Sequence, residues 1–326
     1  MAISEIRELV MRWGLTGGEE PELKPLGGGV SCHVVLVTSS KGKWVVKKAL
    51  PRLMVKDEWL ADRWRIFRET GCLKVIRELV DKNAAPRVLL EDRESYSCVL
   101  EYGEGGVTWK KLLMDGVVDN EVTIRVASIL AKIHTKTSNR SEIVSDFWDD
   151  TNFIQLRIDP YINHLAKKHL DIAPHLYKIS QILTSRKLSL VHGDYSPKNI
   201  LILPDSRIWV LDCEPAHYGN PVFDIAFCTN HLVLKAIHLN SEAHLNAAKL
   251  LWKVYWSTAR WENFHTLEEE ATLTLTAHML ARIDGKSPVE YLNEEKRAKV
   301  RILSKNMIIK AVNEFEKLCE EVRGSL

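Results

Sequence analysis

The chain has 326 residues, of which 45% are hydrophobic and 27% are charged, and its net charge is +2. A chain of this length and composition is large enough to fold into two lobes with their own hydrophobic cores. Basic and acidic residues are mixed along the sequence, which argues against a nucleic-acid or membrane partner. Residues 1–8 contain acids where a signal peptide would be basic, and no apolar run approaches the ~20 residues of a membrane span. We therefore expect a cytoplasmic protein, either a monomer or a homodimer.

The cysteines are scattered along the chain, lie mostly among apolar neighbours and form no C-x-x-C pair. They are Cys32, Cys72, Cys98, Cys213, Cys228 and Cys319. This usage predicts reduced, buried thiols in preference to disulfides or a zinc site.

The first predicted elements are a helix and a pair of strands. Apolar residues recur at helical spacing over residues 3–13, and the pattern ends at Gly14, so this helix is expected to cap the first lobe. Two apolar runs, residues 33–37 and 44–47, follow on either side of a turn signal at 39–42. This pattern predicts two antiparallel strands.

A glycine-rich segment leads into the first of these strands. It contains Gly27, Gly28 and Gly29, with Ser31 shortly after them. Glycines between strands allow positive φ angles and let backbone N–H groups approach phosphates closely, and Ser31 adds a further donor. The alternative is a plain glycine turn between two strands of a hairpin.

Two neighbouring lysines end the second strand, and only one of them can face a nucleotide cleft. Because side chains alternate between the faces of a strand, Lys47 and Lys48 must point in opposite directions. Lys47 closes the strand of residues 45–47, and we expect Lys47 to face the cleft because the same alternation decides which side the apolar residues take.

The remaining elements complete a two-lobed α+β fold. Residues 58–80 have helical periodicity, and residues 86–91 and 97–102 have the character of the last two strands of a five-stranded sheet. The glycine-rich residues 103–106 suit a hinge, and the chain is mostly helical from Thr108 onward. We therefore expect an N-terminal lobe over residues 1–102 and a C-terminal lobe over residues 103–326.

A short hairpin is predicted in the C-terminal lobe. Residues 200–203 and 208–211 are apolar, β-type runs on either side of a turn signal at 204–207. With all four turn residues at the tip, Asn199 faces Asp212, and directly opposed Cβ atoms lie roughly 4.5–5.5 Å apart. An amide oxygen and a carboxylate would then converge, and these ligands suit Mg²⁺.

The segment before the hairpin has the spacing of a kinase catalytic loop. His192, Asp194 and Asn199 follow the pattern His-x-Asp-x-x-x-x-Asn, in which the Asp orients and deprotonates an acceptor hydroxyl and the Asn holds a metal. An ordinary loop with a chance Asp and Asn is the alternative. It is disfavoured because the loop spacing, the hairpin register and the second acid, Asp212, all point to the same chemistry.

These residues resemble a known family, the aminoglycoside phosphotransferase and choline-kinase-like small-molecule kinases. The resemblance implies a bilobal, protein-kinase-like α+β fold. In it, the N-lobe has a five-stranded antiparallel sheet with a helix, and the mainly helical C-lobe carries the catalytic hairpin. It also implies transfer of the γ-phosphoryl of ATP, with Mg²⁺, to a hydroxyl of a small molecule. The matching segments are residues 27–31, 45–47, 192–199, 212–214 and 224–226.

The resemblance also assigns roles to individual residues. Asp194 corresponds to the catalytic base, Asn199 and Asp212 to the Mg²⁺ ligands, and Lys47 to the phosphate clamp. Protein kinases often place a lysine two residues after the catalytic Asp, whereas Lys198 comes four residues after it. A flexible lysine this close to the metal ligand can reach the transferring phosphoryl as a point charge. The alternative for Lys198 is an ordinary surface lysine.

Other roles concern the nucleotide side. In this family a helical glutamate pairs with the lysine, and here the resemblance favours Glu69, with Glu58 as a second choice. A plain solvated glutamate is the alternative. The family holds the adenine with backbone groups at the hinge, which makes Glu101 and Tyr102 the expected adenine-side positions.

The acceptor is the least defined part of the prediction. A polar cluster of Arg282, Asp284 and Lys286 at a helix end is a candidate acceptor site. Its mixed charge favours a sugar or an amino alcohol over a polycationic aminoglycoside, although an antibiotic kinase remains an alternative.

Two other functions are weighed against a small-molecule kinase. A protein kinase is disfavoured because the stretch from Asp212 to Asp224 has no room for an activation loop and no Ala-Pro-Glu. An inactive kinase-like binding protein is disfavoured because Lys47, Asp194 and Asn199 are all present beside Asp212.

Overall fold

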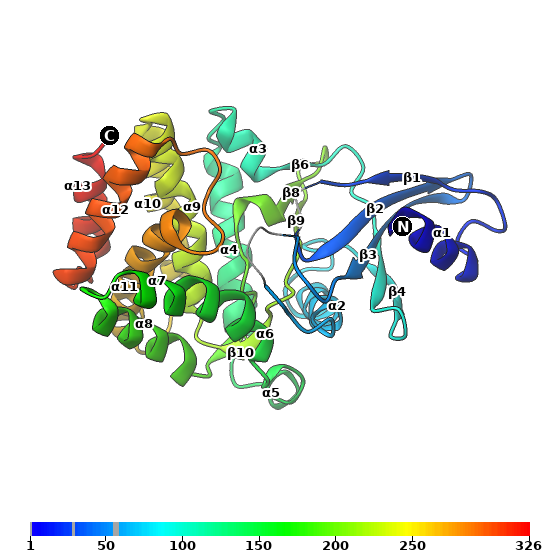
Figure 1. Cartoon of the computed structure of the whole chain (residues 1–326), viewed down its shortest axis with the longest axis horizontal. Helices are drawn as coiled ribbons and strands as arrows, with labels where there is room; N and C mark the ends of the chain where they lie inside the picture. The colour runs from blue at the N-terminus through cyan, green and yellow to red at the C-terminus, as the bar shows by residue number, and fades with distance from the viewer. Residues whose placement is uncertain (1, 28–29, 55–58) are drawn as a thin grey trace.

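The computed structural model describes residues 2–27, 30–54 and 59–326. A five-stranded antiparallel sheet and a larger helical part lie at opposite ends of an elongated molecule (Figure 1). The strand order is β1-β2-β3-β5-β4. The strands are β1 (Glu22–Pro25), β2 (Cys32–Ser39), β3 (Gly42–Ala49), β4 (Val88–Asp92) and β5 (Ser97–Glu101). The predicted α+β class with its five-stranded sheet is confirmed, whereas the lobe boundary after residue 102 stays a prediction.

Helix α1 (Ala2–Arg12) covers one face of this sheet. Ile6 and Val10 lie one helical turn apart and are both fully buried, as their periodicity predicts. They pack against the alternating inward residues of the strands, which are Val35, Val37, Val46 and Val99. The N-terminal helix therefore caps the sheet, as expected.

Helix α2 (Arg65–Val75), extended by a π-helical turn η1 (Ile76–Val80), contacts the sheet strands β3, β4 and β5. The predicted helix was expected to begin at residue 58, and this start is wrong. Asp62 Oδ1 accepts a hydrogen bond from the backbone N–H of Trp64 at 2.9 Å. This local turn precedes the helix, which begins at Arg65. The second-choice residue Glu58 lies outside the described residues.

The predicted catalytic hairpin is present, but its register differs from the prediction by one residue. Strands β8 (Ile200–Ile202) and β9 (Ile208–Val210) pair with Ile202 opposite Ile208. Ser206 has a φ of 63°, and Leu203 N–H bonds to the carbonyl of Arg207 at 2.9 Å, so the loop contains three residues and not four.

This register changes how Asp212 is presented. Asn199 faces Leu211, whose N–H donates to the Asn199 carbonyl at 2.9 Å, so the predicted pairing of Asn199 with Asp212 is wrong. Asp212 follows the strand with a φ of 64°, a left-handed conformation that non-glycine residues seldom adopt. This local turn of the chain, and not the strand pairing, directs the Asp212 side chain.

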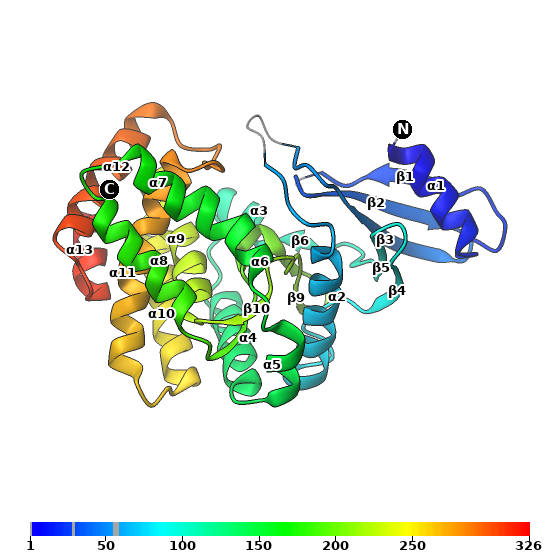
Figure 2. The ribbon, with the colours of Figure 1, turned by 60° about the horizontal axis from the view of Figure 1, so that its bottom comes forward.

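The hairpin lies at the junction of the two parts of the molecule (Figure 2). Strand β6 (Val107–Thr108) pairs with β8, which ties the segment after the sheet to the catalytic hairpin. Gly103 and Gly106 pass close to the Leu201 side chain, where an added Cβ would lie 2.7 Å from Leu201 Cδ2. The glycines of the expected hinge therefore allow the chain to cross the hairpin at close range.

The rest of the chain is mainly helical. Its short elements before the hairpin are α3 (Trp109–Met114), α5 (Ser141–Phe147), α6 (Thr151–Phe153), η2 (Ile154–Asn163), α7 (His164–Lys168), β7 (Ser189–Val191) and η3 (Pro197–Asn199). After the hairpin comes the strand β10 (His217–Gly219), which pairs with β7. The longer helices are α4 (Asn120–Thr137), α8 (Ala173–Ser185), α9 (Val222–Leu239), α10 (Glu242–Ala259), α11 (Phe264–Asp284), α12 (Glu294–Ile309) and α13 (Phe315–Arg323).

Helix α9 forms the centre of the helical part and packs against α10 and α11. Its length and mean hydropathy alone would allow a membrane span, and it is the one such helix among the described residues. In the fold, 89% of this window is buried by protein, as in the core helix of a folded domain, so it is weak evidence for a span.

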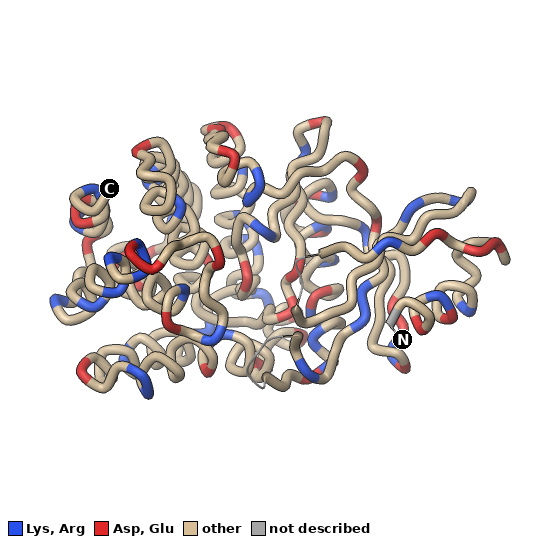
Figure 3. The backbone as a smooth tube through the Cα atoms, turned by 45° about the horizontal axis from the view of Figure 1, so that its top comes forward, with Lys and Arg blue, Asp and Glu red and all other residues tan. Residues whose placement is uncertain are grey.

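The positions of the charged residues and the state of the cysteines in the structure agree with what the sequence predicts. Basic and acidic residues are interspersed over both parts of the molecule (Figure 3). All six cysteines are buried with free thiols, as predicted. Burial, the largest influence, raises the pKa of the Cys32 and Cys98 thiols well above the usual value, which keeps them protonated.

Candidate active site

A cavity of about 350 Å³ separates the sheet from the helical part, at the low end of the usual size for small-molecule sites. Val30 and Ser31 line it from the sheet side, and Tyr161, Phe227 and His231 line it from the helices. The charged residues of its wall are Lys110, Arg157, Asp194, Lys198, Asp212, Glu214, Arg282 and Glu290. The predicted catalytic and metal-side acids thus open onto one space.

Asp194 is 4% exposed and is held by three donors. Its Oδ2 lies 3.1 Å from Arg157 Nη2, 3.0 Å from Lys198 Nζ and 2.8 Å from the amide nitrogen of Asn199. Charge-assisted contacts of this kind fix both the position and the orientation of a carboxylate. Asp194, Lys198 and Asn199, which the sequence singled out, are therefore brought together.

The loop that carries Asp194 is anchored on α9. Asp224 accepts hydrogen bonds from the backbone N–H groups of His192 (2.6 Å) and Gly193 (2.9 Å), and it contacts His134 Nε2 at 3.1 Å. Burial raises the pKa of the Asp224 carboxyl, but His134 and His192 outweigh it and lower the pKa overall. This buried, ionised acid holds the backbone that positions Asp194.

His192 links the catalytic loop to the strand that leads to Asp212. Its Nδ1 accepts the N–H of Asp194 at 3.1 Å, and its Nε2 lies 3.1 Å from the carbonyl of Leu211. Burial, the largest influence, lowers the pKa of this imidazole, so the ring is neutral with one donor and one acceptor nitrogen. His192 therefore bridges the backbone of Asp194 and the backbone of Leu211, the residue before Asp212.

Lys47 is buried and reaches Asp212 at the cavity wall without lining the cavity itself, whereas Lys48 points to the other face of β3 and pairs with Glu5. Lys47 Nζ lies 2.6 Å from Glu69 and 2.7 Å from Asp212. Burial lowers the pKa of its ammonium, but the surrounding carboxylates, with Asp212 first, raise it well above the usual value. Lys47 therefore stays charged and joins the sheet to the catalytic hairpin.

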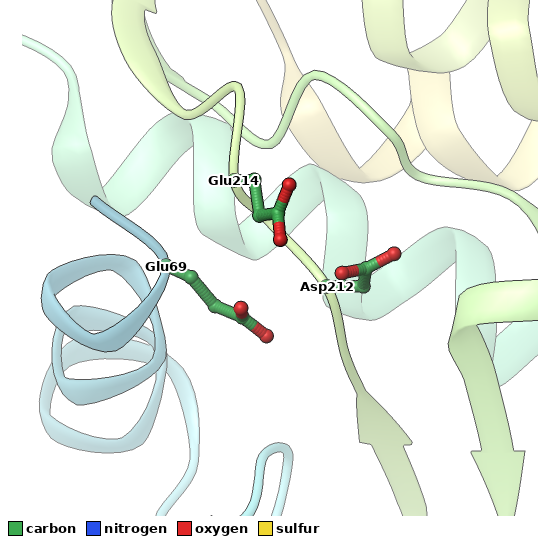
Figure 4. A group of neighbouring side chains, drawn as sticks. All are labelled: Glu69, Asp212 and Glu214. Atoms are coloured by element: carbon green, nitrogen blue, oxygen red, sulfur yellow. The ribbon is translucent and has the colours of Figure 1, made fainter. Parts of the chain in front are cut away.

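Glu69, Asp212 and Glu214 converge from α2 and from the segment after the hairpin (Figure 4). Their oxygen atoms lie within 4.8 Å of one another, a spacing that could hold a metal ion. Lys47 Nζ already contacts all three, at 2.6, 2.7 and 3.9 Å, so this trio is better described as a lysine site. Burial, the largest influence, raises the pKa of Glu69 to about 7.

The residues expected to bind Mg²⁺ have a suitable donor set. Asn199 uses its amide nitrogen for Asp194, which leaves its amide oxygen as a ligand. Asp212 accepts a hydrogen bond from Lys47 through Oδ1, and its side chain is 26% exposed and lines the cavity. An amide oxygen and a carboxylate oxygen fit Mg²⁺, which prefers few protein ligands together with substrate phosphates.

Of the glycine-segment and hinge residues expected on the nucleotide side, some line the cavity and others do not. Ser31 lines it, Gly27 is exposed, and Gly28 and Gly29 lie outside the described residues. Glu101 ends β5 and accepts hydrogen bonds from Arg87, and neither Glu101 nor Tyr102 is among the residues lining the cavity.

The expected acceptor cluster is divided by the structure. Arg282 lines the cavity, but Asp284 does not, because residues two apart on a helix face different sides. Asp284 instead pairs with Arg301 at 2.6 Å and with Lys168 at 3.1 Å. Lys286 lines a second cavity on the far side of η2. The grouping of Arg282, Asp284 and Lys286 as one site is therefore wrong.

Arg157 and His231 are among the cavity residues that sequence analysis missed. Arg157 is 8% exposed and also donates Nε to the carbonyl of Gly193 at 2.6 Å. The available signal was a charged residue inside the apolar run Leu156-Arg157-Ile158, because a buried charge requires a partner.

Fold comparison defines the class of protein. The structure aligns with a choline/ethanolamine kinase family protein from Mesorhizobium loti at a TM-score of 0.55, with 17% identity over 99% of this chain and 100% of that one. It aligns with the streptomycin–ATP–APH(2")-IIa ternary complex at a TM-score of 0.51, with 16% identity over 93% and 95% of the two chains. The fold is therefore the protein-kinase-like fold that these small-molecule kinases share.

Residues 22–253 match the Phosphotransferase enzyme family, APH, and the chain belongs to this family. Among curated proteins, it is 25% identical over 255 residues to Methylthioribose kinase 2 of Oryza sativa subsp. japonica. It is 26% identical over 257 residues to Methylthioribose kinase 1 of the same plant. Each match covers 69% of this chain, but only 59% and 58% of the relatives' own length.

Proposed function

We propose that this protein is a kinase that transfers the γ-phosphoryl of MgATP to a hydroxyl group of a small molecule. The observation that carries the proposal is the position of Asp194, whose buried carboxylate is oriented by Arg157, Lys198 and Asn199 at the wall of a cavity. A carboxylate fixed in this way can orient an acceptor hydroxyl and accept its proton as the new bond forms.

Lys198 is suited to the phosphoryl group itself. Its Nζ lies 3.0 Å from Asp194 and 4.0 Å from Asp212, between the proposed base and a proposed metal ligand. The side chain is 43% exposed, so it can move away from Asp194 toward a phosphoryl group in the cavity. A mobile positive charge at this position would offset negative charge on the transferring group.

The nucleotide is assigned to the side of the cavity formed by the sheet. Lys47 would contact its phosphates, with the Glu69 carboxylate holding the lysine in place, and Ser31 would donate to a phosphate oxygen. Asn199 and Asp212 would hold Mg²⁺, which supplies charge neutralisation at the phosphates. The Gly27 to Gly29 segment and the hinge residues Glu101 and Tyr102 are retained as nucleotide-side positions by their resemblance to the family.

For the acceptor, we infer a sugar or amino-alcohol hydroxyl. The relatives matched in sequence are named methylthioribose kinases, which supports a sugar as the acceptor. An aminoglycoside kinase is less well supported, because likeness to the streptomycin complex extends only to the fold. A location in the cytoplasm fits this proposal.

The direct test is ADP formation from MgATP with a panel of sugars, amino alcohols and aminoglycosides, with the product identified by mass spectrometry. We expect acceptor-dependent ADP formation that is abolished by Asp194→Asn. The matched control is Asp205→Asn, which changes an exposed acid at the tip of the same hairpin and should leave turnover unchanged. Absence of transfer to every acceptor, with ATP binding intact, would favour an inactive binding protein.

A further inference from the structure

Arg282 lines the same cavity as Asp194 and shares an aromatic neighbour, Tyr161, with Arg157. The guanidinium carbons of Arg157 and Arg282 lie 5.7 and 5.9 Å from the centre of the Tyr161 ring. Arg157 in turn holds Asp194, and Arg282 Nη1 donates to the Tyr161 hydroxyl at 3.1 Å. Asp194 and Arg282 both line the cavity, so a single molecule bound there has access to both groups.

Arg282 differs from the other cations of the cavity wall, each of which has a carboxylate partner. Lys110 pairs with Glu290, whereas Arg157 and Lys198 both pair with Asp194. Among the residues the structure describes, Arg282 has no carboxylate within 4.0 Å, and its contacts are neutral groups of Tyr161 and Ser287. Its Nε is buried and makes no hydrogen bond within the described parts of the chain.

A second basic group without a carboxylate partner among the described residues, Lys235, lies behind the same wall. Lys235 is 1% exposed, and its Nζ donates to the carbonyl of His231 at 3.2 Å and lies 5.2 Å from the centre of the Tyr291 ring. No carboxylate of the described residues lies within ion-pair distance of it. Burial, the largest influence, lowers the pKa of the Lys235 ammonium to about 7, and an anion nearby would favour its charged form.

The pKa of His231, which lines this end of the cavity, shows which charged groups lie around it. Burial is the largest influence and lowers its pKa well below the usual value. The charged groups with the largest influence on it are cationic and lower the pKa further. They are Lys235, Arg282, Lys198 and Lys110. Lys235 on α9 and Arg282 on α11 are therefore the leading charges beside His231.

We propose that the acceptor carries an acidic group, a carboxylate or a phosphate, and that Arg282 binds this group while Lys235 stabilises it from behind. The inference rests on the proposed kinase function and narrows its substrate class to hydroxy acids and phosphorylated polyols. The planar guanidinium suits both acids because it donates two parallel hydrogen bonds to a pair of oxygen atoms. The acidic group lies at Arg282, and the hydroxyl of the same molecule lies at Asp194.

The test compares matched neutral and acidic probes on the full-length protein. The probe sets are glycerol, glycerate and glycerol 3-phosphate; serinol and serine; and ribose, ribonate and ribose 5-phosphate. Calorimetry measures binding without ATP, and ADP formation measures transfer. We expect at least one acid to bind at least ten times more tightly than its neutral partner, and the carboxylate and phosphate arms identify which acid is preferred.

Substitutions then test whether Arg282 and Lys235 cause the preference for the acidic probe. Arg282→Gln should raise the Kd of the preferred acid at least tenfold and leave that of its neutral partner unchanged, and Arg282→Lys should restore part of the binding. Lys235→Met keeps the shape of the buried side chain and should also reduce the preference for the acid. The matched control is Arg323→Gln on α13, where an exposed arginine pairs with Glu242 far from the cavity residues.

The outcomes separate this inference from the kinase assignment. Transfer to neutral acceptors with no preference for any acid would overturn the inference and leave the kinase function standing. Binding of an acid that depends on Arg282, without transfer from ATP, would support the acid site and refute the kinase function. If no acid binds more tightly than its neutral partner, or if Arg282→Gln weakens both equally, the inference is wrong.

Discussion

Arg157 holds the carboxylate of Asp194 in place: Nη2 lies 3.1 Å from Oδ2, and Nε donates to the carbonyl of Gly193 at 2.6 Å. One side chain thus fixes both the proposed base and the backbone before it. The arginine comes from η2, a helical turn far from the catalytic loop in sequence, so packing of the helical part determines the geometry of the reaction site.

The first prediction concerns this contact. Arg157→Ala should lower kcat by roughly 10²-fold, because a displacement of about 1 Å at a reacting group has this effect. The KM for ATP should change little, since Arg157 lies on the acceptor side. The control is Arg186→Ala, which removes a half-exposed arginine paired with Glu270. Equal loss of activity in both variants would point to general destabilisation and would contradict the positioning role.

The second prediction concerns the base itself. Asp194→Ala should leave the fold intact by circular dichroism and lower kcat by roughly 10²–10⁴-fold, the usual contribution of a general base. Asp212→Asn should also abolish transfer, but through loss of Mg²⁺-dependent ATP binding. A variant of Asp194 that turns over at nearly the wild-type rate would remove this residue from the mechanism.

The main features of the fold followed from local sequence patterns. Alternation in β3 places Lys47 and Lys48 on opposite faces, and the catalytic-loop spacing places Asp194 beside Asn199. These features depend on neighbours close in sequence, for which periodicity and spacing are informative. Glu69 could be named only by its resemblance to the family, since nothing in a helix sequence identifies a partner 22 residues away.

The features that sequence analysis did not predict depend on backbone conformation or on distant packing. The hairpin register was wrong because Ser206 adopts a left-handed conformation, which shortens the loop by one residue. Asp284 was assigned to the acceptor site because its partner Arg301 lies on the next helix, where no sequence signal joins them. Arg157 was missed because its carboxylate partner lies 37 residues further along the chain.

The third prediction separates ground-state binding from transition-state stabilisation. Lys198→Ala should lower kcat far more than it raises the KM for ATP, because a charge that meets the phosphoryl group mainly in the transition state contributes little to nucleotide binding. Steady-state kinetics with varied ATP give both constants. An unchanged kcat with a raised KM would make Lys198 a nucleotide-binding residue instead.

The last prediction concerns the pH dependence of stability through His217 on β10. This ring stacks on Phe153 with 4.0 Å between ring centres, and its Nδ1 lies 3.1 Å from the carbonyl of Pro215. Burial, the largest influence, lowers its pKa from 6.5 to about 4. In the unfolded chain the imidazole takes up a proton below pH 6.5, whereas the folded protein resists protonation until about pH 4.

The folded state should therefore lose stability as the pH falls from 6.5 to 4, by about 3 kcal/mol from this group. His217→Phe keeps the stacking on Phe153 and removes the titration, so its free energy of unfolding should fall less over this range. Urea unfolding at pH 4, 5, 6 and 7 measures the difference. His265→Gln, at an exposed position on α11, is the matched control and should follow the wild-type profile. Parallel profiles for His217→Phe and the wild type would show that this buried histidine does not contribute to acid sensitivity.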